Sequence, residues 1–444
     1  LIPVAAASYN LYGSHGVRLP FLALSLTAVL LMIAAVLALL TALAPWQMWR
    51  RAAAAIGIRW AYAGLAALGA TGAILWSQSL WRPTAQLTFQ LVRDVLAPIL
   101  PTLEADAATR ILSTPRFAIE VSSICSGLEG VGLMLAFCSA WLLYFRAEYR
   151  FPRALLIIPA GILLVFALNV ARIAALMLIG NAGHPAIALY GFHSQAGWIA
   201  FNCAACAVAF ASRRSRWLSR TPDRGAAAGS EVSAATSNPT AAYLLPFLAV
   251  LAAGMLSRAL SGGFETWYAL RLAAAAAALA CCWRSLARLD WRFSWRGIAA
   301  GGAVFALWLA ASRLVLVPRD MPAALAAMSA GARGLWIAGR AFSAILVVPL
   351  VEELAYRGYL LRRLDAENFE TVSYRAVGWV PLLVTAIAFG VLHGPLWPAG
   401  IAAGLVFGLV AICTGRLAEA VAAHVTSNLL LAAVVLAAGQ WQLW

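Results

Sequence analysis

The sequence predicts an all-α fold, a polytopic transmembrane helical bundle. Hydrophobic residues make up 63% of the 444-residue chain and charged residues only 11%, and the mean hydropathy is +0.85. Soluble domains are about 25% charged, so this composition indicates an integral membrane protein. The apolar runs are about 20 residues or longer, which is the length a helix needs to cross a bilayer. They lack the short alternating pattern of a membrane β-barrel.

The apolar segments predict about twelve helices in two unequal bundles. The first bundle is expected near 19–45, 54–76, 119–145, 153–180 and 195–212. The second is expected near 242–260, 266–283, 297–317, 335–361, 379–393, 396–414 and 417–440. Residues 213–241 are rich in Ala, Ser, Thr, Gly and Pro, as flexible linkers are. We therefore predict domains at 1–212 and 242–444, joined by a linker at 213–241.

Arginine clusters orient the first bundle. The net charge of +15 lies mainly in short loops between apolar segments, as the positive-inside rule requires, so we expect a lipid bilayer and no nucleic acid as partner. The clusters are Arg50, Arg51 and Arg59; Arg146, Arg150 and Arg153; and Arg213, Arg214, Arg216 and Arg220. All three fall on one side if five helices cross, so that side and the linker are predicted to be cytoplasmic. The opposite side then carries residues 77–118 and 181–194, which are predicted to be loops.

Three reactive residues that are far apart in sequence fall at or near the predicted outer face: Cys125, Arg172 and His193. A neighbouring His or cation lowers the pKa of a thiol and favours the nucleophilic thiolate. His193 could serve as acid and base. Arg172 is costly in lipid and is expected to face a cavity, where it could stabilise a thiolate or an oxyanion. The alternative is that Cys125 only fills space and that His193 is a solvated loop residue.

Glu129 follows Cys125 by four residues, so a continuous helix would place both on one face. Its carboxylate could orient His193 or pair with Arg172, and it could equally repel a thiolate.

The second bundle carries three polar motifs inside apolar helices: "VEELAYRGYL" at 351–360, "FGVLH" at 389–393 and "HVTSN" at 424–428. Adjacent carboxylates in an apolar run are costly and usually functional. Glu353 and Arg357 are four residues apart on a helix and are expected to pair. Glu352 points about 100° away and is left free for chemistry.

Two catalytic interpretations of these motifs compete with a structural one. In the first, Glu and His side chains bind a divalent metal that activates water. In the second, Glu352 and His393 activate water without metal, while His424 and Asn428 hold the oxyanion. The third is a polar packing network or a proton path. Simple alternation of crossings places Glu352 and His393 toward opposite faces, unless the helices break near residues 378–381 and 394–398.

The first bundle resembles the exosortase/archaeosortase family. The resemblance rests on "CSGL" from Cys125, "NVARI" from Asn169 and "HSQAGW" from His193, in that order, and covers about residues 19–212. It implies a transpeptidase in which Cys125 is the nucleophile, His193 the acid and base, and Arg172 the electrostatic partner, with no cofactor. Family members often carry a basic residue soon after the CSG motif, where this chain has Glu129.

The second bundle is similar to the CPBP family of CAAX proteases and bacteriocin-processing proteins over about residues 335–440, through its EExxxR, FxxxH and HxxxN motifs. This resemblance implies a glutamyl-type intramembrane endopeptidase. Glu352 and His393 would activate water, and His424 and Asn428 would form the oxyanion hole. Glu353 and Arg357 would support them, and a divalent metal is the alternative cofactor at this site.

The fusion of the two resembles the exosortase E/protease subtype. That resemblance implies a bacterial inner-membrane enzyme that cleaves C-terminal sorting signals of the VPEID or PEP-CTERM type from membrane-tethered exported proteins. Two other classes of function compete with this one. A transporter or channel would use the buried Glu, Arg and His as an ion or proton path, and a scaffold would recruit exported proteins without cleaving them.

Overall fold

The computed structural model describes residues 80–220 and 238–444 and the single residues 47, 50, 54 and 57. The chain divides into two compact units, residues 1–81 and 82–444, and the elements below belong almost wholly to the second. The helices expected near 19–45 and 54–76, and most of the predicted linker, lie outside the described residues.

The predicted fold class is confirmed. Among the described residues, eight helices are long and apolar enough to cross a membrane, and two shorter apolar helices cover 128–144 and 379–391. Every helix expected within the described residues is observed. The chain is a multi-pass, all-α integral membrane protein.

Between residues 121 and 220, the N-terminal group contains three long helices and shorter turns. The helices are α5 (Leu128–Tyr144), α6 (Ile157–Asn181) and α7 (His193–Arg214). The turns are the 3-10 segments η1 (Ser123–Ser126), η2 (Arg146–Glu148) and η3 (Arg153–Leu156), and the π-helical segment η4 (Ile187–Phe192). Since η4 runs directly into α7, residues 187–194 are helical, and the loop predicted at 181–194 is wrong over that part.

Two arginine-rich segments meet at one end of this group. The backbone N–H of Arg150 donates to Leu218 O at 2.8 Å, and that of Arg220 donates to Glu148 O at 2.8 Å. They therefore lie on the same side, as the charge pattern predicts. Cys125 lies beyond the opposite end of α5, whose 17 residues span about 25 Å.

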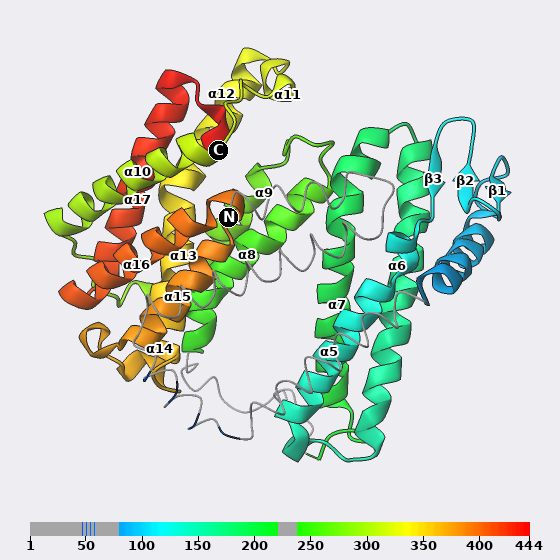
Figure 1. The fold of residues 1–444 in the computed structure, drawn as a ribbon, viewed down its shortest axis with the longest axis horizontal. Helices are drawn as coiled ribbons and strands as arrows, with labels where there is room; N and C mark the ends of the chain where they lie inside the picture. Colours follow the sequence, from blue (N-terminus) through cyan, green and yellow to red (C-terminus); the bar gives the residue numbers. More distant parts are fainter. Residues whose placement is uncertain (1–46, 48–49, 51–53, 55–56, 58–79, 221–237) are drawn as a thin grey trace. The chain divides into compact units, whose positions relative to one another are not determined.

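A small subdomain occupies residues 80–120, where the sequence interpretation expected only a loop. A helix covers 80–96, followed by an antiparallel sheet with strand order β1-β2-β3 (Figure 1). The strands are β1 (Glu104–Asp106), β2 (Ile111–Ser113) and β3 (Ala118–Glu120). Strands of three residues are too short to show a recognisable alternation, which is why the sequence did not reveal them. Because β3 ends at Glu120, the helix expected from residue 119 begins later, with α5 at Leu128.

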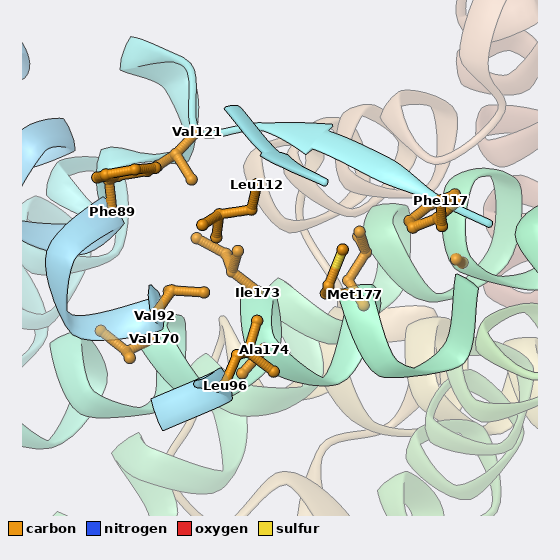
Figure 2. Close-up of a cluster of buried hydrophobic side chains, with 12 residues drawn as sticks. Phe89, Val92, Leu96, Leu112, Phe117, Val121, Val170, Ile173, Ala174 and Met177 are labelled. Atoms are coloured by element: carbon orange, nitrogen blue, oxygen red, sulfur yellow. The ribbon is translucent and has the colours of Figure 1, made fainter. Parts of the chain in front are cut away.

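Apolar packing fixes this subdomain to α6. Figure 2 shows Phe89, Val92 and Leu96 of the helix and Leu112, Phe117 and Val121 of the sheet region gathered against Val170, Ile173, Ala174 and Met177 of α6. The Thr114 hydroxyl donates to Asn181 Oδ1 at 2.8 Å, which ties the sheet to the end of α6. Cys125 packs at the border of this cluster, so the subdomain supports the segment that carries the thiol.

The C-terminal group contains seven membrane-length or shorter apolar helical segments, in agreement with the seven expected. They are α8 (Pro239–Ala259), α9 (Ala269–Leu286), α10 (Trp295–Val315), the continuous segment 330–363, α15 (Trp379–Val391), α16 (Trp397–Thr414) and α17 (Leu417–Ala438). Short turns connect them: α11 (Ala323–Ala326), η7 (Phe369–Thr371), η8 (Tyr374–Ala376), η9 (Gly394–Leu396) and η10 (Trp441–Leu443).

Small residues let these helices approach closely. A Cβ at Gly301 of α10 would collide with the Ala423 carbonyl oxygen of α17, and a Cβ at Gly404 of α16 would lie 2.9 Å from the Ala386 Cα of α15. Close backbone approach at small residues is a usual way to associate helices in lipid. These contacts bring the motif-bearing helices together.

The segment 330–363 is not a uniform α-helix. It runs through α12 (Ala330–Phe342), the π-helical η5 (Ser343–Val347), α13 (Val348–Glu353), the π-helical η6 (Leu354–Leu360) and α14 (Leu361–Arg363). π-Helical turns occur frequently at functional sites. Here they flank the short helix that ends with the paired glutamates.

Candidate active sites

The three reactive residues of the N-terminal group line one cavity. Its volume is about 210 Å³, and its wall includes Cys125 of η1, Arg172 of α6 and His193 of α7. Glu129 and Asn169 line the same space. The structure therefore brings together all four residues that the sequence singled out at this site, and adds an asparagine.

A left-handed glycine shapes the turn that carries the thiol. Gly127 separates η1 from α5 with φ +86°, a conformation that disfavours any residue with a Cβ. Asn169 Nδ2 donates to the Cys125 carbonyl at 3.1 Å, and the Thr88 hydroxyl donates to the Ser126 carbonyl at 3.0 Å. Two flanking helices thus hold the backbone carbonyls of the nucleophile candidate and of the residue that follows it.

The sequence interpretation missed these two supporting residues. Asn169 stood within a motif that was recognised, but its role depends on a contact across 44 positions. Thr88 was missed because its segment was expected to be a loop, although the apolar residues Ala85, Phe89 and Val92 around it recur at helical spacing. A third group, the Ser122 hydroxyl, lies 3.6 Å from Cys125 Sγ and donates to it.

Arg172 has a guanidinium available to an anion. Among the residues that the structure describes, it makes no hydrogen bond or ion pair, and it packs beside Gly197, where a Cβ would lie 3.0 Å from Nη1. His193 is exposed to the cavity. A thiol, an imidazole and an unpaired guanidinium around one space are the groups that acyl transfer needs.

Cys125 and Glu129 do not lie on one continuous helix, which their spacing in the sequence would have allowed. The helix does not continue from Cys125 to Glu129, because Gly127 interrupts it, yet both residues line the cavity. Within the described part of the chain, Glu129 forms no ion pair with Arg172 and no hydrogen bond with His193. Its carboxylate is exposed and adds negative charge to the cavity wall.

The polar motifs of the C-terminal group line a second cavity of about 220 Å³. Glu352, His393, His424 and Asn428 all contribute to its wall. The conflict expected from alternating crossings disappears, because α15 has only 13 residues and spans about 20 Å, less than the roughly 30 Å of a bilayer core. A turn with Gly394 at φ +54° follows, so His393 lies at the end of a short helix.

A buried carboxylate organises the second cavity. Glu353 Oε1 accepts hydrogen bonds from Arg357 Nη1 at 2.8 Å and from His424 Nδ1 at 3.0 Å. Arg357 Nη2 also donates to the Gly404 carbonyl at 3.0 Å. The predicted pairing of Glu353 with Arg357 is therefore confirmed, and both side chains are fully buried. Since an ionised carboxylate only accepts, the Nδ1 hydrogen of His424 is committed to Glu353.

His393 is held by its own helix. Its Nδ1 lies 2.9 Å from the Phe389 carbonyl, an acceptor, so Nδ1 carries the hydrogen and Nε2 is free to accept a proton. The Phe389 and Trp308 rings lie 4.6 and 5.3 Å from the imidazole. His393 lies in the turn between α15 and α16, and burial lowers its pKa, with the charges of His424 and Arg357 acting in the same direction.

The remaining two motif residues differ in how many of their polar atoms already have hydrogen-bond partners. Glu352 lines the cavity, and its Oε2 is buried without a hydrogen-bond partner among the described residues. Asn428 Nδ2 donates to the Ala344 carbonyl at 2.7 Å, which leaves its second amide hydrogen for the cavity. Within residues 80–220 and 238–444, no group of three or more His, Cys, Asp or Glu side chains is arranged to hold a metal ion.

Comparison with known proteins found a match to a different family model in each of two regions of the chain. Residues 2–210 match the family model of the transmembrane exosortases, and residues 334–430 match that of the Type II CAAX prenyl endopeptidase Rce1-like proteins. All residues that line the first cavity lie in the first region. The motif residues of the second cavity lie in the second region, and the rest of its wall includes Val304, Trp308, Leu431, Leu443 and Trp444 from outside it. Neither a curated protein nor a solved structure gave a match.

Proposed function

We propose that this chain is a membrane protease that has two active sites with separate chemistries, because residues 2–210 match the exosortase family model and residues 334–430 match that of the Rce1-like CAAX endopeptidases. The first would be a cysteine transpeptidase at the outer face of a bacterial inner membrane. Its substrates would be membrane-tethered exported proteins with a C-terminal sorting signal of the VPEID or PEP-CTERM type. It needs no cofactor.

The observation that carries the first assignment is the cavity shared by Cys125, Arg172 and His193. The Cys125 thiolate attacks the scissile carbonyl carbon, and the oxyanion that forms lies near the Arg172 guanidinium. When the C–N bond breaks, His193 gives a proton to the leaving amine. The acyl group is then a thioester on Sγ. An acceptor amine or water attacks this thioester, loses a proton to His193 and releases the Cys125 thiolate.

The outer-face location is supported by the arginine-rich end of the same group. The segments around Arg150 and Arg220 are joined there by backbone hydrogen bonds, about one α5 length from the thiol. An arginine-rich end is typical of the cytoplasmic side. The cavity would then open where a sorting signal emerges from the membrane.

The second site would hydrolyse a peptide within or near the membrane. Glu352 and His393 Nε2 are proton acceptors that line the cavity without a hydrogen-bond partner among the described residues, so they would activate water. His424 could donate to an oxyanion only as an imidazolium, through Nε2, because its Nδ1 hydrogen is held by Glu353. Asn428 would donate its second amide hydrogen. A divalent metal is the alternative, and inhibition by a chelator with recovery on metal addition would favour it.

The test is mass spectrometry of a tagged sorting-signal substrate coexpressed with wild type, Cys125→Ala or Glu352→Gln. We expect Cys125→Ala to leave the signal uncleaved and Glu352→Gln to leave that first cleavage intact. Cys206→Ala is the matched control, because this exposed cysteine of α7 lies outside the cavity. Normal processing by Cys125→Ala would refute the thiol mechanism. Thiol-insensitive ion flux in proteoliposomes, with no processing, would support the transporter alternative.

A further inference from the structure

The second cavity extends to a cation that the proposed reaction does not use. Arg340 of α12 lines this cavity together with Glu352, His393 and His424. In the part of the chain that the structure describes, Arg340 has no carboxylate within ion-pair distance. Its Nη1 donates to the Tyr268 hydroxyl at 3.0 Å, and its guanidinium faces the rings of Tyr268 and Trp444 at 5.0 and 5.7 Å.

These contacts hold the guanidinium in place without neutralising it. A guanidinium has five N–H donors in a planar fork, and only one is used in these contacts. The side chain is half-buried, and an uncompensated charge in an apolar setting is costly unless it meets a partner. The other arginine near this cavity, Arg357, is already paired with Glu353. Arg340 is therefore the guanidinium here that is left for a ligand.

The distance along the helix between Arg340 and Glu352, the candidate catalytic carboxylate, determines how long a peptide must be to contact both. Arg340 and Glu352 lie on one continuous helical segment, 330–363, and their separation in sequence corresponds to a rise of about 18 Å. An extended peptide rises about 3.3 Å per residue, so about five residues span that length. Figure 1 shows the C-terminal end of the chain beside α12, and the ring of the last residue, Trp444, has its centroid 5.7 Å from the Arg340 guanidinium carbon.

We propose that Arg340 is a specificity-determining residue that binds a carboxylate of the peptide cleaved at the second site, about five residues from the scissile bond. The planar fork of Arg matches a carboxylate with two parallel hydrogen bonds. The carboxylate comes from an acidic side chain or from the peptide's C-terminus. This inference rests on the proposed hydrolytic function of that site.

The test uses the full chain in proteoliposomes and matched peptides that carry Glu or Gln, or a free or amidated C-terminus, about five residues from the cleaved bond. For wild type we expect kcat/KM about tenfold higher for the charged member of one of the two pairs. Arg340→Gln should abolish this preference by slowing the charged peptide only, and Arg340→Lys should keep part of it. Arg333→Gln is the matched control, since Arg333 lies on the same helix, donates to Ala326 O and does not line the cavity.

Peptide binding to a Glu352→Gln background separates this inference from the proposed hydrolysis. Tighter binding of the charged peptide, lost in Glu352→Gln/Arg340→Gln, would support carboxylate recognition even if wild type cleaved nothing. Cleavage by wild type without any preference for the charged peptides would overturn the role of Arg340 and leave the proposed hydrolysis standing. The role of Arg340 would also be overturned if Arg340→Gln lowered kcat/KM equally for charged and uncharged peptides, or if the Glu352→Gln protein bound both peptides equally.

Discussion

Replacing Gly127 by alanine should inactivate the thiol site while leaving the helices packed. Gly127 adopts φ +86°, and an added Cβ would lie 2.8 Å from Asn169 Nδ2. The left-handed conformation costs an L-residue about 1–2 kcal/mol. Moving the Asn169 amide away also removes its hydrogen bond to the Cys125 carbonyl, which is worth about 0.5–1.5 kcal/mol.

Together these effects amount to about 2–3 kcal/mol against the native turn. Since 1.4 kcal/mol corresponds to a factor of ten, the native arrangement of Cys125 loses roughly 30-fold or more relative to displaced ones. The perturbation is local, because Gly127 lies between η1 and α5 rather than within a membrane helix. We therefore expect at least a tenfold fall in substrate cleavage with little change in the melting temperature.

The assay measures cleavage of the tagged sorting-signal substrate in proteoliposomes, with thermal unfolding in parallel. Gly132→Ala is the matched control: it makes the same change in α5, where an added Cβ meets nothing within 4 Å. Alanine is also the better helix former there. Asn169→Ala removes the hydrogen bond directly, so Gly127→Ala/Asn169→Ala should lose less than the sum of the single losses. Wild-type cleavage by Gly127→Ala, or full additivity of the two changes, would refute the reasoning.

Three further changes test the rest of the structure. Phe117→Ala removes a ring that packs over Gly180, which should lower the free energy of unfolding by up to about 3–5 kcal/mol and slow the Cys125-dependent cleavage. An equal fall in second-site cleavage would contradict a local role for Phe117. Glu353→Gln leaves the buried Arg357 without its carboxylate, which should lower the free energy of unfolding by about 3–5 kcal/mol. We therefore expect a lower melting temperature in a thermal-shift assay and loss of second-site cleavage in a peptide-hydrolysis assay. Because burial holds the pKa of His393 below its ordinary value of 6.5, His393 is neutral at pH 7 and stops acting as a base only as the pH drops through that lowered pKa. A fall in second-site kcat/KM that wild type shows and His393→Gln lacks should therefore lie below pH 6.5, and a His393-dependent fall above pH 6.5 would argue against His393 as the base.

Much of the fold could be predicted because membrane helices are encoded locally. A run of about 20 apolar residues is sufficient to identify one, and each helix expected among the described residues is observed. The pairing of Glu353 with Arg357 was also predictable, since residues four apart share a helix face. Arginine placement likewise predicted that residues 146–153 and 213–220 lie on one side.

The subdomain at 80–120 was missed from the sequence for two different reasons. Its three-residue strands carry no periodic signal long enough to recognise. Its helix does carry one, because Ala85, Phe89, Val92 and Leu96 are buried at helical spacing, but that pattern was overlooked. The helix and the sheet are both stabilised by contacts with α6, which is distant in sequence (Figure 2). The support that Asn169 and Thr88 give to the thiol turn depends on the same packing.

The sequence by itself determined that this is a multi-pass α-helical membrane protein, and it placed reactive side chains in two separate groups of helices. Composition and spacing suffice for that, because the bilayer requires long apolar helices and makes each buried polar residue conspicuous. Only the tertiary structure decided which atoms remain free within each group. Glu353 holds Arg357 and His424 while Glu352 faces the cavity, and the Gly127 turn gives Cys125 and Glu129 a common cavity without a common helix. Such arrangements follow from contacts between distant segments, where hydrogen bonds and close packing select one partner among several that spacing alone allows.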